Sequence, residues 1–177
     1  MEKNLEKAAL RNRIKAARPH SSQGLTENMT IVAREFFTPG RMPTIASYSS
    51  QETEPRTHDF NDLIVKEGAT LVLPRIRGTE LDFAEGPLVE GSFGILEPSG
   101  KAVDPDSIDL LFLPALAVDL AGNRLGKGKG FYDRFLSNNH SASFAVIFEP
   151  ELLDSIPTEE FDEKISGVIT PKAIHRF

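Results

Sequence analysis

The residues best suited to chemistry stand together in one run, which reads Arg-Leu-Gly-Lys-Gly-Lys-Gly-Phe-Tyr-Asp over residues 124–133. Glycines allow backbone N–H groups to approach a ligand closely and to form a concave, anion-binding nest. The arginine and the two lysines add positive charge, and a helix that begins near Gly130 would add its N-terminal N–H groups. The run therefore favours polyphosphate binding, although a solvated basic loop is the alternative that its composition leaves open.

The glycine spacing excludes the two best-known phosphate loops. A Walker A loop needs Gly-Lys followed by Ser or Thr, but here Gly130 is followed by Phe131. The dinucleotide fingerprint needs its last two glycines three residues apart, whereas the glycines at 126, 128 and 130 simply alternate. A phosphate site of another family is the better interpretation.

The composition narrows the class of protein. The chain has 177 residues, which fits a single domain spanning 1–177. It contains no cysteine, which excludes disulfides, thiolate zinc sites and cysteine nucleophiles and is typical of a reducing compartment. It contains no apolar run of membrane-spanning length, and its first residues lack the apolar core of a signal peptide. We therefore expect a cytoplasmic protein with no membrane partner, and the net charge of −6 argues against nucleic-acid binding.

The elements that must position the 124–133 run alternate between strands and helices. Apolar periodicity and turn residues predict helices over 2–18, 26–37, 57–67 and 130–137, and strands over 44–48, 69–73, 109–113, 144–148 and 167–170. Thr26 and Thr57 are the expected helix caps. This order predicts a three-layer α/β fold, with a mostly parallel central sheet, helices on both faces and an irregular loop or hairpin insertion over 76–106.

Ligands of such sheets bind beyond the carboxyl ends of the strands. The polar features expected there are Glu54, Arg75, the segment 119–133, Glu149 and Asp162. Asp133 is the best candidate for a magnesium ligand because it adjoins the Gly/Lys run, although a carboxylate is also favoured in the first turn of a helix without any metal. Asp119 and Asp162 are candidates for a second acidic group.

Two basic residues near the N-terminus leave their role open. Lys7 and Arg11 lie four residues apart, so that a helix would present them on one face. Taken alone, this spacing favours a solvated basic stripe.

The Gly/Lys run is the end of a longer pattern. Residues 113–119 read Leu-Pro-Ala-Leu-Ala-Val-Asp, and residues 122–133 read Gly-Asn-Arg-Leu-Gly-Lys-Gly-Lys-Gly-Phe-Tyr-Asp. At these residues the sequence resembles the 5-formyltetrahydrofolate cyclo-ligase family. Further matches in the same order are Lys7 to Arg11, Glu54 to Thr57, Leu73-Pro74-Arg75, Glu97-Pro98, Pro157, Asp162 and Ile169-Thr170. The resemblance thus extends along almost the whole chain.

The resemblance implies an enzyme that uses MgATP to convert 5-formyltetrahydrofolate to 5,10-methenyltetrahydrofolate by phosphorylating the formyl oxygen. It implies reduced folate and ATP as substrates, Mg²⁺ as cofactor, and Lys129, Arg124 and Lys127 as the catalytic residues. The implied ATP-binding residues are Lys7, Arg11, Arg124, Leu125, Gly126, Lys127, Gly128, Lys129, Gly130, Phe131 and Tyr132. The implied folate-binding residues are Ser49, Glu54, Lys127, Gly128, Lys129, Gly130 and Phe131, and the implied metal ligands are Asp133 and Asp162.

The sequence departs from the family pattern at four places. Phe131 stands where a tyrosine is common, Ala115 and Val118 replace Gly and Phe, and Phe161 replaces the His or Asn before the late aspartate. These changes motivate an alternative, a non-catalytic or repurposed folate- or nucleotide-binding relative. We expect a monomer in either case.

Overall fold

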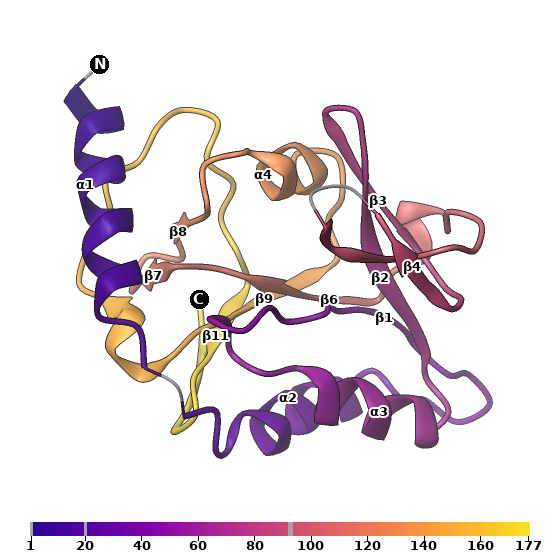
Figure 1. Cartoon of the computed structure of the whole chain (residues 1–177). Helices are drawn as coiled ribbons and strands as arrows, with labels where there is room; N and C mark the ends of the chain where they lie inside the picture. Colours follow the sequence, from indigo (N-terminus) through magenta and orange to yellow (C-terminus); the bar gives the residue numbers. More distant parts are fainter. Residues whose placement is uncertain (1, 20, 92–93) are drawn as a thin grey trace.

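A mixed sheet of seven strands forms the centre of the computed structural model, which describes residues 2–19, 21–91 and 94–177 (Figure 1). Its strands lie in the order β12-β11-β9-β6-β1-β2-β3. The inner strands are β1 (Thr44–Ala46), β2 (Thr70–Arg77), β6 (Leu110–Pro114), β9 (Ala142–Val146) and β11 (Gly167–Ile169), and they pair in parallel. The edge strands β3 (Glu80–Ala84) and β12 (Ile174–Arg176) are antiparallel.

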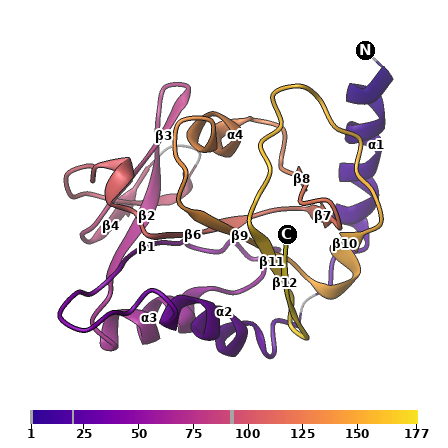
Figure 2. The ribbon, with the colours of Figure 1, turned by 180° about the vertical axis from the view of Figure 1, so that it is seen from behind.

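Helices cover both faces of this sheet, because its central strands are apolar on both sides. In β6, Leu110 and Phe112 face a core that includes residues of α2 (Leu25–Arg34) and α3 (His58–Lys66). Leu111 and Leu113 face a second core that contains residues of α4 (Phe131–Leu136). Seen from behind, α2 and α3 again lie below the sheet and α4 above it (Figure 2). The predicted three-layer architecture is confirmed.

The first helix takes a different position. α1 (Glu2–Ala16) packs through Ile14 and Leu10 on a small separate sheet formed by β10 (Leu152–Leu153), β7 (Ala117–Asp119) and β8 (Arg124–Leu125). Leu5 is 69% exposed, whereas Lys7, whose spacing from Arg11 favoured a solvated position, is buried. This small sheet stands beside the main one and holds α1 along one side of the molecule (Figure 1).

β2 runs through Pro74, although the sequence predicted that the strand would end there. The carbonyl of Val72 accepts a hydrogen bond from Ser47 N just past the end of β1. The nitrogen of Pro74 lies on the same side of the strand two residues later, where β1 has no residue left to pair with. The missing N–H therefore breaks no ladder bond, and β3 pairs with the opposite side of β2 as far as Arg77.

The segment 76–106 is more regular than expected. It contains the end of β2, the strand β3 and a second hairpin of β4 (Leu88–Glu90) and β5 (Leu96–Pro98), and the short 3₁₀ helix η2 (Pro105–Ser107) follows. A further 3₁₀ helix, η3 (Glu149–Glu151), lies outside this segment. Residues 92 and 93 of the predicted insertion lie outside the described residues. The insertion is a pair of hairpins rather than irregular loops.

Neither predicted threonine cap forms. α2 begins after Gly24, so Thr26 lies inside the helix. Thr57 does occupy the N-cap position of α3, but its hydroxyl donates to the carbonyl of Tyr48 at 2.5 Å instead of accepting from the helix. The bond ties the start of α3 to the loop after β1.

None of the helices in the described part of the chain has the length and apolar character needed to cross a membrane.

Candidate active site

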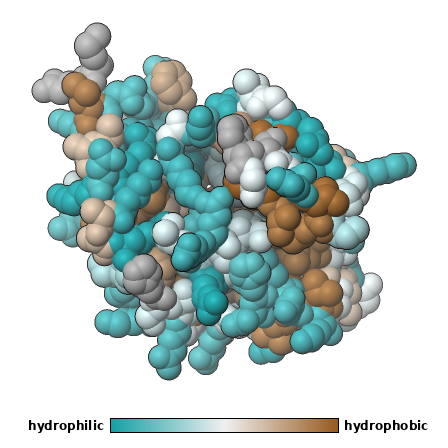
Figure 3. Space-filling view, viewed as in Figure 1, coloured by the Kyte–Doolittle hydropathy of each residue, from teal (hydrophilic) through white to brown (hydrophobic). Residues whose placement is uncertain are grey.

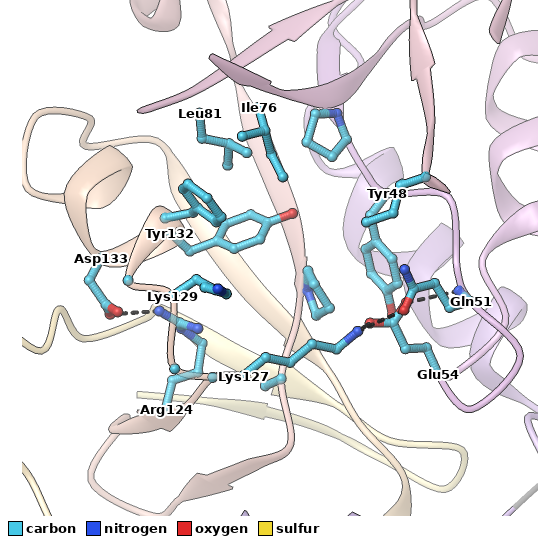
Figure 4. A pocket seen from close by; sticks show the side chains of 18 of the residues that line it. Tyr48, Gln51, Glu54, Ile76, Leu81, Arg124, Lys127, Lys129, Tyr132 and Asp133 are labelled. Carbon is cyan, nitrogen blue, oxygen red and sulfur yellow. Dashed lines mark hydrogen bonds and ion pairs between the residues drawn. The ribbon is translucent and has the colours of Figure 1, made fainter. Parts of the chain in front are cut away.

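A cavity of about 370 Å³ lies beyond the carboxyl ends of β1 and β6. Its walls come from α1, the loop after β1, β2, β3, the β4–β5 hairpin and the 124–133 run. One side is basic and the other is apolar, with Ile76 and Leu81 facing Lys127 and Arg124 across the space (Figure 4). On the surface, hydrophilic side chains surround the hollow, and a hydrophobic patch that includes Leu88, Val89 and Leu96 lies on the hairpin beside it (Figure 3).

The 124–133 run forms the floor of this cavity because its glycines take conformations that other residues avoid. Gly128 and Gly130 have φ of 97° and 68°, in the left-handed region. At Gly126 a Cβ would lie 2.8 Å from Nη1 of Arg124, so a larger residue there would displace the end of that side chain. The loop also holds α1 in place, because Nε of Arg11 donates to the carbonyl of Gly126 at 2.9 Å.

Arg124 is buried and faces an acid. Its Nη2 donates to Oδ1 of Asp133 at 2.6 Å, and its guanidinium carbon lies 5.8 Å from the centre of the Tyr132 ring. Nε of Arg124 is buried without a hydrogen-bond partner among the described residues. A buried donor without a partner is costly, so Arg124 is suited to bind an acceptor that the chain does not supply.

Lys7 is held in a similar way on α1. Its Nζ lies 2.5 Å from Oδ2 of Asp162 and 2.9 Å from Oε2 of Glu159. Burial lowers the pKa of Lys7, but the hydrogen bonds and charges of Asp162 and Glu159 outweigh it and leave the pKa above its usual value. The ammonium therefore stays charged at neutral pH beside the cavity.

Glu54 and Lys127 meet across the cavity. Nζ of Lys127 lies 2.6 Å from Oε1 of Glu54 and donates to Oε1 of Gln51 at 3.0 Å (Figure 4). The second oxygen of Glu54 accepts from the backbone N–H of Gln51 at 2.9 Å. Glu54 is thus a buried carboxylate with both oxygens in use.

Two tyrosines lie near this carboxylate. Burial, and to a smaller degree the charge of Glu54, raise the pKa of Tyr48 and of Tyr132 well above the usual value of a phenol. Both hydroxyls are therefore neutral donors over the physiological range. The hydroxyl of Tyr132 points into the cavity (Figure 4).

A model of the 5-formyltetrahydrofolate cyclo-ligase family matches residues 3–171. The chain belongs to the 5-formyltetrahydrofolate cyclo-ligase family. Its relatives include the 5-formyltetrahydrofolate cyclo-ligase of Mycolicibacterium smegmatis, 37% identical over 73% of this chain and 74% of that protein. The enzyme of the same name from Mus musculus is 27% identical over 92% of this chain and 90% of its own length. The solution structure of Aquifex aeolicus 5,10-methenyltetrahydrofolate synthetase superposes with a TM-score of 0.80 at 27% identity, covering 96% of this chain and 92% of that one.

These findings confirm the resemblance and the enzyme class, a cyclo-ligase. They leave the roles of single residues untested, but the structure shows where those residues lie. Every residue that the family resemblance implied for the site lines the cavity: Lys7, Arg11, Ser49, Glu54, Arg124, Leu125, Gly126, Lys127, Gly128, Lys129, Gly130, Phe131, Tyr132, Asp133 and Asp162. Oγ of Ser49 also lies 3.5 Å from Nε2 of His58.

Three polar residues were expected at the ligand site because they follow predicted strands, but they lie elsewhere in this cyclo-ligase fold. Arg75 is inside β2 and pairs with Asp82 on β3 at 2.7 Å. Asp119 closes a turn, and Glu149 begins η3; neither lines the cavity. A position after a strand therefore does not by itself place a side chain in the cavity. Arg75 stabilises the β2–β3 hairpin instead, and Asp119 stabilises its turn.

Sequence reasoning missed the apolar wall and the residues around Glu54. The missed lining residues are Tyr48, Gln51, Leu73, Pro74, Ile76, Leu81, Ile95, Leu96, Glu97, Pro114 and Ala115. Four of these, Tyr48, Leu73, Pro74 and Pro114, stand at the ends of predicted strands, which was a signal available for them.

The carboxylates of the cavity suit magnesium, whose preferred ligands are oxygens. Asp133 uses Oδ1 for Arg124, and Asp162 uses Oδ2 for Lys7. No cluster of three or more acidic or histidine side chains that could hold a metal exists among the described residues. Magnesium bound with a nucleotide takes only one or two carboxylates, the remaining ligands being phosphate and water, so Asp133 and Asp162 fit this group.

Proposed function

We propose that this chain catalyses the ATP-dependent cyclisation of 5-formyltetrahydrofolate to 5,10-methenyltetrahydrofolate, with release of ADP and phosphate. The observation that carries the proposal is the single cavity in which a basic Gly/Lys floor faces a buried carboxylate and an apolar wall. The floor suits a polyphosphate, the carboxylate suits the N–H groups of a pterin, and the wall suits the aromatic rings of a folate. Family membership supports the same activity.

The reaction divides into two transfers. The formyl oxygen attacks the γ-phosphorus of ATP, so that an O–P bond forms as the bond to ADP breaks. The neighbouring folate nitrogen then attacks the activated carbon and loses its proton, and the C–O bond breaks to release phosphate. Neither step needs a covalent bond to the protein, so positioning and charge neutralisation supply the catalysis.

The chain's own residues would provide both the positioning and the charge neutralisation. Lys7, Arg11, Arg124, Lys127 and Lys129 bring positive charge to the phosphates, and the backbone N–H groups around the glycines add fixed dipoles. Bound magnesium, held by Asp133 and Asp162, would neutralise further phosphate charge.

The folate side is positioned by other groups. Glu54 would accept hydrogen bonds from the pterin, and Ser49 lies beside it on the same loop. Phe131 lines the cavity in place of the tyrosine common in the family, so an aromatic ring is kept there.

The test is a turnover assay. The protein is incubated with MgATP and 5-formyltetrahydrofolate, and the absorbance of the methenyl product is followed beside an active family member. We expect turnover that collapses in Lys129→Ala and persists in Lys66→Ala, a control on the exposed surface of α3. Tight folate binding without any turnover would instead support a non-catalytic relative. The expected monomer, the cytoplasmic location and the lack of nucleic-acid binding stay predictions.

A further inference from the structure

The ion pair between Lys127 and Glu54 joins the two halves of the cavity. Lys127 belongs to the basic floor, whereas Glu54 belongs to the loop after β1, and the lysine side chain extends across the space between them (Figure 4). Under the proposed function, on which this inference rests, the first residue serves the nucleotide and the second serves the pterin. A ligand that approaches Glu54 through the cavity therefore meets Lys127 first.

The ammonium of Lys127 lies on the side of Glu54 that faces the cavity (Figure 4). Oε2 is committed to the N–H of Gln51 within a tight turn, which the bond from Glu54 N to the Gln51 carbonyl closes at 2.9 Å. Oε1 carries the bond to Lys127. Only 5% of the Glu54 side chain is exposed, and Lys127 reaches it through the cavity, so a pterin N–H group that approaches Oε1 from the cavity must take the place of the ammonium (Figure 4).

The Lys127 side chain has room to move once Glu54 releases it. Its side chain is 45% exposed, and Gly126 and Gly128 on either side give its backbone freedom. The released ammonium remains on the floor of the cavity, where an ATP phosphate is the strongest acceptor that the proposed reaction supplies.

We propose that Lys127 couples the two substrates: the pterin displaces it from Glu54, and the freed ammonium then binds the phosphates of ATP. Folate therefore raises the affinity for the nucleotide, and by linkage the nucleotide raises the affinity for folate by the same factor.

The experiment measures nucleotide affinity by calorimetry with Mg²⁺ and a non-hydrolysable ATP analogue, with and without saturating 5-formyltetrahydrofolate. In the wild-type protein, folate should tighten binding of the analogue by roughly 5- to 20-fold. In Glu54→Gln without folate, the analogue should bind about as tightly as it does to the wild type with folate, because the ammonium is no longer held by a charge. Lys127→Met should bind the analogue weakly, with no response to folate.

A matched control separates coupling from a general change in charge. Glu97 is a second buried carboxylate in the cavity lining, and it bonds to Ile76 N rather than to Lys127. Glu97→Gln removes the same charge and should keep the wild-type response to folate. Thermal unfolding of each variant establishes that it is folded.

The outcomes are distinguishable. If both ligands bind the wild type independently, or if Glu54→Gln and Glu97→Gln tighten nucleotide binding equally, the coupling is refuted and the proposed function stands. If neither ligand binds the wild type, the proposed function fails, and the coupling fails with it.

Discussion

Replacing Lys7 by methionine should destabilise the protein measurably, because the lysine neutralises two acids that the fold brings together. Lys7 makes charged hydrogen bonds to Asp162 at 2.5 Å and to Glu159 at 2.9 Å. Each such bond contributes about 1.5–3 kcal/mol when fully buried. The acid side chains are 19% and 33% exposed and regain water in the variant, so about half of that sum, on the order of 2 kcal/mol, should be lost. Methionine has nearly the volume of lysine, so no cavity adds to the loss.

The measurement is urea unfolding, with thermal unfolding as a second probe. A loss of this size lowers the midpoint of thermal unfolding by about 4–8 °C in a chain of this length. Because the pKa of Lys7 is raised in the folded protein, its contribution is fully present below the ordinary lysine pKa and is lost only as the pH rises through the folded value. The difference between the variant and the wild type should therefore be constant from about pH 6 to pH 9.

Lys3 supplies the matched control. It lies one helical turn before Lys7 and makes one exposed hydrogen bond, to the carbonyl of Thr158. Lys3→Met should change stability by less than about 0.5 kcal/mol. In a Lys7→Met/Asp162→Asn double variant, part of the lost stability should return, because one unpaired charge is gone. Equal unfolding midpoints for Lys7→Met and the wild type would refute this account of the pair.

Three other changes have expected outcomes. Asp119→Asn should cost about 2 kcal/mol in urea unfolding, because the carboxylate accepts four hydrogen bonds, including one from Ile156 N. Burial raises the pKa of Asp119 but these bonds outweigh it and lower the pKa, so its contribution is present above the ordinary range and should fade as the pH falls below about 4. Gly128→Ala should weaken nucleotide binding in calorimetry and cost about 1–2 kcal/mol, since alanine resists a φ of 97°; unchanged affinity would contradict the assigned loop geometry. Arg18→Met should cost about 3 kcal/mol in thermal unfolding because it leaves Glu151 buried and unpaired, whereas an Arg18→Met/Glu151→Met double variant should recover stability.

The sequence predicted the parts of the fold that local patterns determine. β6 and β9 are apolar runs buried on both faces, and such runs are visible without any knowledge of their neighbours. The course of β2 beyond Pro74 was not predictable in this way. A proline normally ends a strand, and it is tolerated here only because β1 is too short to reach it.

In the candidate site, too, local patterns predicted some residues, whereas others are brought together only by the fold. The glycine spacing at 126, 128 and 130 pointed to a phosphate loop by local chemistry alone. The place of Lys7 in the site could not be predicted from local chemistry, because a basic pair on a helix has the same spacing whether it is solvated or buried. Here Lys7 is 3% exposed and is paired with acids far along the chain. The ion pair between Lys127 and Glu54 also joins distant parts of the chain, so that only the fold could reveal it.

The proline in β2 also affects whether a further strand can pair with the edge of β2 beside the cavity. Beyond β1, one side of β2 is an open sheet edge, and an open edge ordinarily accepts a further strand from a peptide or from another copy of the chain. Here Pro74 offers no donor, and the next N–H on that side, at Ile76, is already taken by the carboxylate of Glu97 at 3.1 Å. At these two positions the edge therefore offers no free N–H group to a further strand. The part of β2 that lines the cavity is thus a poor template for backbone pairing.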